Sequence, residues 1–338
     1  MVAGKRHYFG ERWADPYDAL REYDFKREYL EQGLPDPSRI TKTFGDAIDD
    51  FLIAKNKLVK KHEMALRTWN DYDEQCKKIL RVIGANRSFN GITPNDFERL
   101  RESFKGGPVT VTNNVVRSKV VFSWIEKHFD VKFNYQDTFN RPTKRVMRKR
   151  ESANPKREFE AVEIRQLIEH AKPQMKAMIL LGINCGMGNT DVGLLEADRL
   201  DLDKQWHTHA RPKTGVARHA FLWDETVAAL RVVLGDRKSG LAFRTKYGQC
   251  WAREDKNNPL AHEFAKLRNT LGLDKGLTFY GLRQAFQTIG DNSLDFPVVQ
   301  AIMGHADTSM SAVYGAFPED RLKRVATIVH DWLFEVGP

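Results

Sequence analysis

The sequence predicts a mainly α-helical chain with a small β component, an α+β class. Apolar residues recur at three- and four-residue spacing through most of residues 41–135 and 157–338, as on one face of a helix. Two short stretches, residues 205–211 and 216–222, flank Lys213-Thr214-Gly215 and predict a β-hairpin. At 338 residues the chain is long enough for two domains, each with its own core.

Composition predicts a water-soluble protein of the cytoplasm. Hydrophobic residues make up 41% of the chain, and no uninterrupted apolar run has the length of a membrane span. The start of the chain lacks the charged-then-apolar pattern of a signal peptide. Cys76, Cys185 and Cys250 lie far apart and suggest neither a disulfide framework nor a metal site. Because no glycine-rich nucleotide-binding loop is present either, we expect no metal, no small-molecule cofactor and no membrane partner.

A net charge of +9 favours a polyanionic partner, of which nucleic acid is the commonest. Basic residues concentrate in residues 141–157, against the single acid Glu151. Such a stretch repels itself and releases counterions when it lies along phosphates. Charge alone also fits a basic protein with a solvated surface. The predicted DNA contacts are Arg141, Lys144, Arg145, Arg148, Lys149 and Arg150, with Arg117 and Lys119 on a preceding helix.

The first part of the chain predicts a short segment followed by a helical bundle. In residues 1–40, a strand is expected at 6–10 and a helix from Pro16 to Gln32. Residues 41–135 predict four helices. Helix-starting signals are Thr43 and the pair Thr93-Pro94, and Gly84 suits the end of the second helix, which is expected over 63–83. The fourth helix carries an apolar face over 111–129.

Residues 136–156 are expected to link this bundle to a longer, mixed unit that spans residues 157–338. Two helices open that unit, the hairpin follows, and the remainder is mainly helical. The predicted helices are 162–171, 174–185, 225–234, 259–271, 279–292, 297–303, 309–314 and 318–334.

Three residues that can take part in polar chemistry follow one another near the end of the chain. Arg283 lies on an apolar-periodic helix, where a guanidinium needs an anionic partner. His305 follows Gly304, 22 residues after Arg283, and Tyr314 follows nine residues later. Taken singly, each has an ordinary explanation: an internal salt bridge, a helix cap and a packed ring. Together, the order Leu282-Arg283, Gly304-His305, Tyr314 resembles the second half of the active site of the tyrosine recombinases, or phage integrases.

The resemblance covers roughly residues 41–338 and implies a fold and a reaction. It implies a helical core-binding domain over residues 41–135 and a catalytic domain over 157–338, around duplex DNA. Residues 1–40 resemble the end of an arm-binding module, and a tail packed on a neighbouring domain or subunit is an equal alternative. The implied reaction is site-specific cleavage and rejoining of DNA through a 3′-phosphotyrosyl intermediate, without metal or nucleotide. The implied setting is the nucleoid, with the chain assembling on DNA as a dimer or tetramer.

The resemblance also assigns roles to individual residues. Tyr314 is the expected nucleophile, because covalent storage of the phosphodiester on a tyrosine keeps the cut reversible. Arg283 is the expected phosphate clamp, since its planar fork donates two parallel hydrogen bonds and keeps its charge. His305 is expected to bond the same phosphate. Lys213, on the hairpin, is the expected acid that protonates the leaving 5′ oxygen.

Two of the six usual catalytic positions differ from the family pattern. In the stretch from Cys185 to Val192, Gly188 stands where the first clamp arginine is expected. Tyr280 stands where histidine or lysine usually precedes the second arginine. Arg211 is the first candidate to supply the missing charge, since strand alternation would put it on the same face as Lys213. Arg218, a residue supplied in trans, or a neutral donor from Asn189 are the alternatives.

The sequence is therefore compatible with three functions. The first is an active site-specific recombinase, in which another basic side chain completes the clamp. The second is a catalytically impaired, integrase-derived protein that binds DNA without cutting it. The third is a helical interaction module with a coincidental basic stretch, which would show no salt-dependent affinity for DNA.

Overall fold

The computed structural model is mainly helical with one small sheet, and this confirms the predicted fold class. The chain divides into two compact units, residues 1–154 and 155–338. Each has its own buried apolar cluster. The structure describes residues 9, 16–31, 42–135, 137–153, 157–211, 213, 215–252, 258–305 and 317–335.

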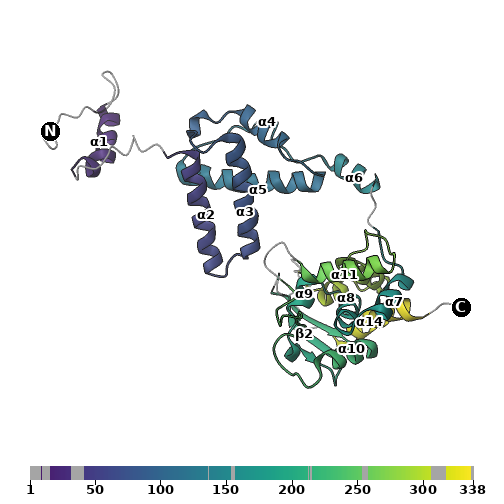
Figure 1. The fold of residues 1–338 in the computed structure, drawn as a ribbon. Helices are drawn as coiled ribbons and strands as arrows, with labels where there is room; N and C mark the ends of the chain where they lie inside the picture. The colour runs from purple at the N-terminus through teal and green to yellow at the C-terminus, as the bar shows by residue number, and fades with distance from the viewer. Residues whose placement is uncertain are drawn as a thin grey trace. The chain divides into compact units, whose positions relative to one another are not determined.

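The first unit is helical throughout its described part (Figure 1). Its elements are α1 (Pro16–Glu31), α2 (Phe44–Lys60), α3 (Leu66–Ile83), the 3₁₀ turn η1 (Phe89–Gly91), α4 (Pro94–Glu102), α5 (Pro108–Phe129) and α6 (Lys144–Ala153). The strand expected at residues 6–10 lies outside the described residues, apart from Phe9.

The helix starts in this unit follow the predicted capping signals. The Thr43 hydroxyl accepts a hydrogen bond from the backbone N–H of Asp46, and the Asp46 carboxylate accepts one from the backbone of Thr43. At α4, the backbone N–H of Thr93 donates to the Asp96 carboxylate. Helix α3 begins at Leu66, three residues later than expected, because the turn after α2 holds His62 in the left-handed region with φ of 59°.

Aromatic side chains fill the core of the first unit. Phe97 and Phe122 meet edge to face with ring centroids 5.1 Å apart, and Phe122 meets Phe133 in the same manner at 5.6 Å. Phe139, which follows the last helix of the bundle, is also fully buried in this cluster. The chain beyond α5 therefore packs back onto the bundle as far as residue 139.

Helix α6 lies within the basic stretch and was not expected from its charge. Its sequence, KRVMRKRESA, consists mostly of residues with high helix propensity, which explains how it forms without a buried face. The side chain of Arg150 crosses the backbone at Gly107, where an added Cβ would lie 1.2 Å from the guanidinium nitrogen. Glycine at this position therefore lets α6 approach the start of α5.

The second unit is mixed. Its elements are α7 (Ala161–His170), α8 (Pro173–Asn184), α9 (Asn189–Gly193), η2 (Ala197–Arg199), β1 (Leu200–Asp201), β2 (Trp206–Ala210), β3 (Ala217–Phe221), α10 (Asp224–Leu234), α11 (Pro259–Thr270), α12 (Phe279–Gly290), η3 (Asp291–Ser293), α13 (Phe296–Ile302) and α14 (Glu319–Phe334). The helix expected at 309–314 lies outside the described residues.

Helix α8 is buried on all sides from Ala177 to Asn184. It lies in the interior of this unit (Figure 1). It packs between α10 and α12, while α14 covers α7, α12 and β3. Its last residue, Asn184, donates to the carbonyl of Phe221 and accepts from the backbone N–H of Trp223. These two hydrogen bonds of the buried Asn184 side chain connect the end of β3 to α8. In the described part of the chain, no helix has the length and apolar character needed to cross a membrane.

The predicted hairpin is present as β2 and β3, which pair antiparallel from Trp206↔Phe221 to Ala210↔Ala217. The turn is closed by the backbone N–H of Arg211 donating to Val216 and that of Gly215 donating back to Arg211, both at 2.8 Å. Gly215 has φ of 69°, which glycine adopts without strain. The two-residue strand β1 extends the sheet on the other edge of β2.

Candidate active site

A buried carboxylate, Asp191 on α9, gathers three arginines from distant parts of the second unit. Arg218 Nη2 lies 3.4 Å from its Oδ1, and Arg211 Nε lies 3.8 Å from the same oxygen. Arg283 Nη1 lies 3.9 Å from Oδ2, which also accepts a hydrogen bond from the backbone N–H of Gly188. The Asp191 carboxylate thus holds the backbone at Gly188 in place. It is also the negative charge that the three arginines share.

Arg283 is held rigidly on α12. Its side chain is 1% exposed, and Nη1 donates to the carbonyl oxygens of Gly186 at 2.5 Å and Met303 at 3.0 Å. Nη2 lies 2.7 Å from Nε2 of His305. Burial, and then the positive charge of Arg211, lower the pKa of Arg283. These bonds leave Arg283 little freedom to reorient, as a preorganised clamp requires.

The contacts of His305 define its protonation state. A guanidinium can only donate, so Nε2 facing Arg283 must accept, and the proton must lie on Nδ1. Nδ1 then donates to the side-chain oxygen of Gln300. Burial, followed by the charges of Arg283, Arg211 and Lys213, lowers the pKa of His305. The ring is therefore neutral near pH 7.

The glycine before His305 has a steric role. Gly304 has φ of 64°, and an added Cβ would lie 2.5 Å from Cδ of Arg218 and 3.1 Å from Cβ of Arg211. The Arg211 Nη1 donates to the Gly304 carbonyl at 3.3 Å. Only glycine lets the loop after α13 lie this close to the hairpin arginines.

The hairpin also brings two histidines to this face, which the sequence analysis missed. His207 and His209 on β2 alternate with Arg211, which directly follows that strand, and His209 is paired with Arg218 on β3. His207 is fully buried, and its ring nitrogens have no hydrogen-bond partner among the described residues. Burial and then Arg218 lower the pKa of both rings. The alternation of residues 207, 209 and 211 is the signal that could have revealed them.

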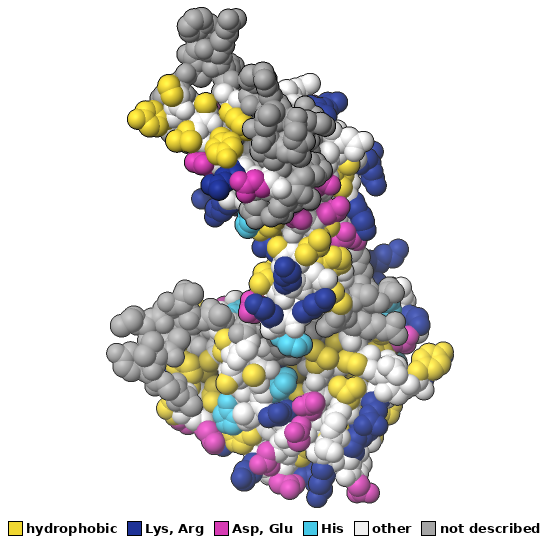
Figure 2. All heavy atoms as spheres, turned by 90° about the vertical axis from the view of Figure 1, so that its left-hand side faces the viewer, with side chains coloured by type: hydrophobic (Ala, Val, Ile, Leu, Met, Phe, Trp, Pro, Cys, Tyr) yellow, Lys and Arg dark blue, Asp and Glu magenta, His cyan; other side chains and the backbone are white. Residues whose placement is uncertain are grey.

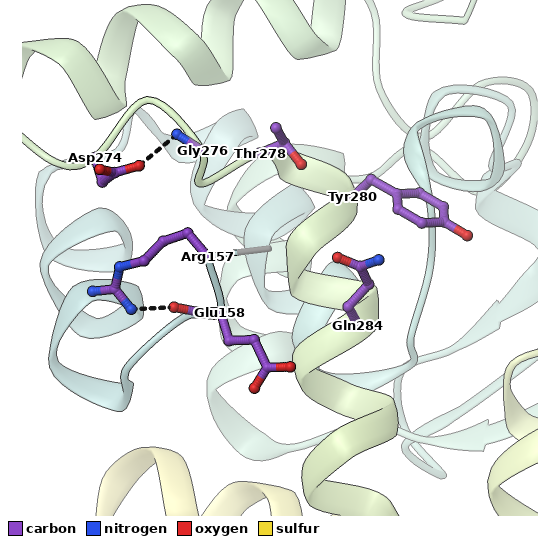
Figure 3. Close-up of a pocket in the computed structure, with 7 residues that line it drawn as sticks. All are labelled: Arg157, Glu158, Asp274, Gly276, Thr278, Tyr280 and Gln284. Carbon is purple, nitrogen blue, oxygen red and sulfur yellow. Dashed lines mark hydrogen bonds between the residues drawn. The ribbon is translucent and has the colours of Figure 1, made fainter. Parts of the chain in front are cut away.

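Position 188 is bordered by an aromatic ring. A Cβ on Gly188 would lie 3.6 Å from Cδ2 and Cε2 of Tyr280 and 3.4 Å from the Asp191 carboxylate. Tyr280 is 48% exposed and projects from the first turn of α12 (Figure 3). The two positions at which the sequence departs from the family pattern are therefore neighbours in space.

A broad cavity of about 1020 Å³ lies beside this turn, and Tyr280 is one of its lining residues (Figure 3). Its lining residues are Arg157, Glu158, Asp274, Gly276, Thr278, Tyr280 and Gln284. Arg157 already donates to the carboxylates of Glu160 and Glu163 and to the carbonyl of Glu158. Because Arg157 is already paired with carboxylates, this cavity should attract an anion more weakly than the Asp191 cluster does.

Two further predicted catalytic residues are Lys213 and Tyr314. Lys213 is exposed on the hairpin turn, whereas Tyr314 lies outside the described residues. Lys and Arg side chains appear on the surface of both units (Figure 2). The six basic residues within 141–150 that are predicted to contact DNA are all exposed: Arg141, Lys144, Arg145, Arg148, Lys149 and Arg150.

On α5 the two other predicted DNA contacts already have partners within the first unit. Arg117 is paired with Asp71 at 2.5 Å, and Lys119 lies over the ring of Tyr135 at 5.8 Å from its centroid. Both are partly buried. They would have to release or share these contacts to reach a phosphate.

The cluster carries more positive than negative charge. Three guanidinium groups share the carboxylate of Asp191, which leaves an excess of two positive charges. Among the described residues, no hydrogen-bond partner accepts from Nε of Arg211 or from any of the three nitrogens of Arg218. Buried charge of this kind calls for an anion, and the fork geometry of arginine suits a phosphate.

Comparisons with known proteins find similarity over the second unit. Residues 157–319 match the phage integrase family. The tyrosine recombinase XerD of Pseudomonas putida is 26% identical over 159 residues, which cover 44% of this chain and 52% of the relative. The chain thus spans about half the length of this curated relative.

Solved structures share the fold at low sequence identity. A lambda integrase dimer bound to a COC′ core site is 14% identical with a TM-score of 0.60, over 82% of this chain and 99% of that one. The Tn1549 transposon integrase in complex with transposon right end DNA is 14% identical with a TM-score of 0.60, over 81% and 96%. A lambda integrase tetramer bound to a Holliday junction is 15% identical with a TM-score of 0.60, over 90% and 91%.

The matched segment contains the Asp191 cluster and extends over nearly all of the second unit. Residues 157–319, slightly under half of the chain, are thus similar to the phage integrase, or tyrosine recombinase, family.

Proposed function

We propose that this protein cuts and rejoins duplex DNA at a specific site through a covalent 3′-phosphotyrosyl intermediate. The observation that carries the proposal is the Arg283–His305 pair, 2.7 Å apart, held in a buried cluster with excess positive charge. Nε of Arg283 has no hydrogen-bond partner among the described residues, so the guanidinium can donate it to a phosphodiester and neutralise the charge that develops there, while the neutral His305 ring holds the guanidinium in place.

In the proposed reaction, the oxygen of Tyr314 attacks phosphorus and the bond from phosphorus to the 5′ oxygen breaks. Lys213 gives a proton to that leaving oxygen, for which its exposed position on the hairpin turn is suitable. The phosphodiester is then stored on the tyrosine. Attack by a free 5′ hydroxyl restores the DNA strand and releases the tyrosine, so the step needs no external energy source.

We infer that the basic stretch of the first unit contributes to DNA binding. Six exposed basic side chains lie within residues 141–150. We infer assembly on DNA as a dimer or tetramer, at the nucleoid, since related integrases have been solved as a dimer and as a tetramer on DNA.

A second candidate function is DNA binding without cutting. It is favoured by one observation, the glycine at position 188 where the family pattern has an arginine. Under this alternative, the Asp191 cluster would grip a phosphate but stabilise its transition state too weakly for cleavage.

A nicked duplex separates the two candidates. The DNA site would first be recovered by selecting bound duplexes from a random library. In a copy nicked just beside the cleavage position, the short leaving strand diffuses away and the covalent complex accumulates. A protein–DNA adduct that survives denaturing electrophoresis would support recombinase activity. Tight, salt-dependent binding with no adduct at any nick position would support the non-cutting alternative.

A further inference from the structure

We propose that Arg211 replaces the missing clamp arginine as a phosphate-binding catalytic residue, and that Arg218 positions it. This inference rests on the proposed function and assigns a residue to it. The phosphate would then meet two guanidinium groups from different segments, Arg283 on α12 and Arg211 at the start of the hairpin turn.

Accessibility distinguishes Arg211 from the other two arginines. Its side chain is 11% exposed, whereas those of Arg218 and Arg283 are 1% exposed. Its Nη1 donates to the carbonyl of Gly304, the residue directly before His305. Its Nε has no hydrogen-bond partner among the described residues. Arg211 is therefore the hairpin arginine that can offer donors to a phosphate held by the Arg283–His305 pair.

The charge balance favours the same assignment. One carboxylate, Asp191, cannot neutralise three guanidinium groups, so part of the positive charge stays uncompensated. Arg218 is buried and lies closest to that carboxylate, at 3.4 Å. Arg211 is the most exposed of the three and has the weaker contact with Asp191, at 3.8 Å. Of the two hairpin arginines, Arg211 is therefore the one whose positive charge is more available to a bound phosphate.

Arg218 has the geometry of a positioning residue. Its Cγ and Cδ lie directly beneath Gly304, within 2.7 Å of where a Cβ would be. Its side chain thus separates the sheet from the loop that carries His305. Arg218 carries the same charge as Arg211 and shares the Asp191 carboxylate with it, so we expect Arg218 to influence where the Arg211 guanidinium lies.

The decisive experiment compares a charged with a neutral scissile phosphate. Adduct formation would be timed on the nicked duplex with an ordinary phosphodiester and with a methylphosphonate, which lacks one negative oxygen. We expect Arg211→Ala to slow the reaction on the phosphodiester by about 10²–10³-fold, as for the loss of one transition-state donor. On the methylphosphonate the loss should shrink to less than about 10-fold, because less charge needs to be neutralised.

Matched variants separate charge from structure. Arg211→Lys keeps the charge and should lose less than Arg211→Ala on the phosphodiester. Arg231→Ala removes another arginine that is paired with a carboxylate, Asp203, but on the exposed face of α10, and should match the parent protein. Arg218→Gln should lose activity equally on both substrates, as expected for a positioning residue. Equal losses for Arg211→Ala on both substrates would overturn the assignment.

A second readout does not depend on cleavage. Orthovanadate, a tetrahedral phosphate analogue, would be titrated into the full chain by calorimetry. Arg211→Ala should weaken its binding by at least about 10-fold, whereas Arg231→Ala should leave it unchanged. If the parent forms no adduct, the proposed function fails and this titration still decides the role of Arg211. Unchanged affinity in Arg211→Ala, or no binding by the parent, would overturn it.

Discussion

The ring of Tyr280 borders Gly188, with two ring carbons 3.6 Å from where a Cβ on residue 188 would lie. Restoring the family arginine by Gly188→Arg should therefore reduce adduct formation, by about 10-fold or more, because the longer side chain must displace the ring and adds a charge beside Arg211. Gly188→Ala is the control. Gly188 has φ of −89°, and a methyl group there makes only ordinary contacts, so this variant should keep the parent rate.

The same relationship predicts a rescue. In a chain that carries Arg211→Ala, adding Gly188→Arg together with Tyr280→His should recover part of the lost activity, since the ring is smaller and the charge returns from the usual position. Rates of adduct formation on the nicked duplex measure both effects. A rise in rate for Gly188→Arg alone would show instead that the clamp of the parent protein is incomplete.

Salt dependence tests the basic stretch. Replacing Arg145, Arg148, Lys149 and Arg150 with glutamine should make binding less dependent on salt. The slope of log affinity against log salt concentration should decrease in magnitude by up to about 3–4 if all four residues neutralise phosphates. Glutamine has a helix propensity close to that of lysine and arginine, so α6 should persist. Fluorescence anisotropy on a labelled duplex between about 50 and 200 mM salt gives the slope. An unchanged slope would remove the stretch from the DNA interface.

Stability should fall in mild acid because of the histidines beside Arg218. The pKa of His207 lies well below its ordinary value of 6.5, first because of burial and then because of Arg218. The unfolded chain therefore binds more protons than the folded chain below about pH 6.5. The stabilisation that comes from keeping His207 neutral is present above that pH, and it is lost as the pH falls toward the pKa of His207 in the folded chain. His207→Leu should reduce this pH dependence.

Urea unfolding at about pH 7.5 and pH 5.5 measures the effect, since the midpoint of the parent should drop more than that of His207→Leu. His170→Asn, on the exposed end of α7, is the matched control and should behave as the parent does. Parallel drops in the parent and in His207→Leu would assign the acid sensitivity to other groups.

Local signals in the sequence predicted most of the fold. The capping threonines Thr43 and Thr93 and the apolar spacing located the helices, and Gly215 with its flanking strands located the hairpin. Such features depend on neighbouring residues, so they can be recognised without the tertiary structure. Helix α6 was missed because its charge was given more weight than its helix propensity.

The site was only partly predictable, because its parts meet through tertiary packing. Spacing singled out Arg283 and His305, and strand alternation singled out Arg211. The sequence could not show that Asp191 would gather three arginines, since this depends on α8 packing against α12 while Asn184, at the end of α8, bonds the end of β3. Nor could it show that Arg218 points inward, because alternation separates the two faces of a strand without saying which one is buried. The role of Tyr314 stays a prediction.

The identity of the covalently linked residue tests the central claim most directly. After reaction with the nicked duplex, the adduct would be digested and the peptide that carries the nucleotide sequenced by mass spectrometry. We predict a 3′-phosphate joined to Tyr314, and no adduct from Tyr314→Phe, which should still bind the duplex because its ring remains while the attacking oxygen is gone. An adduct at any other residue, or one that survives Tyr314→Phe, would contradict the proposed mechanism.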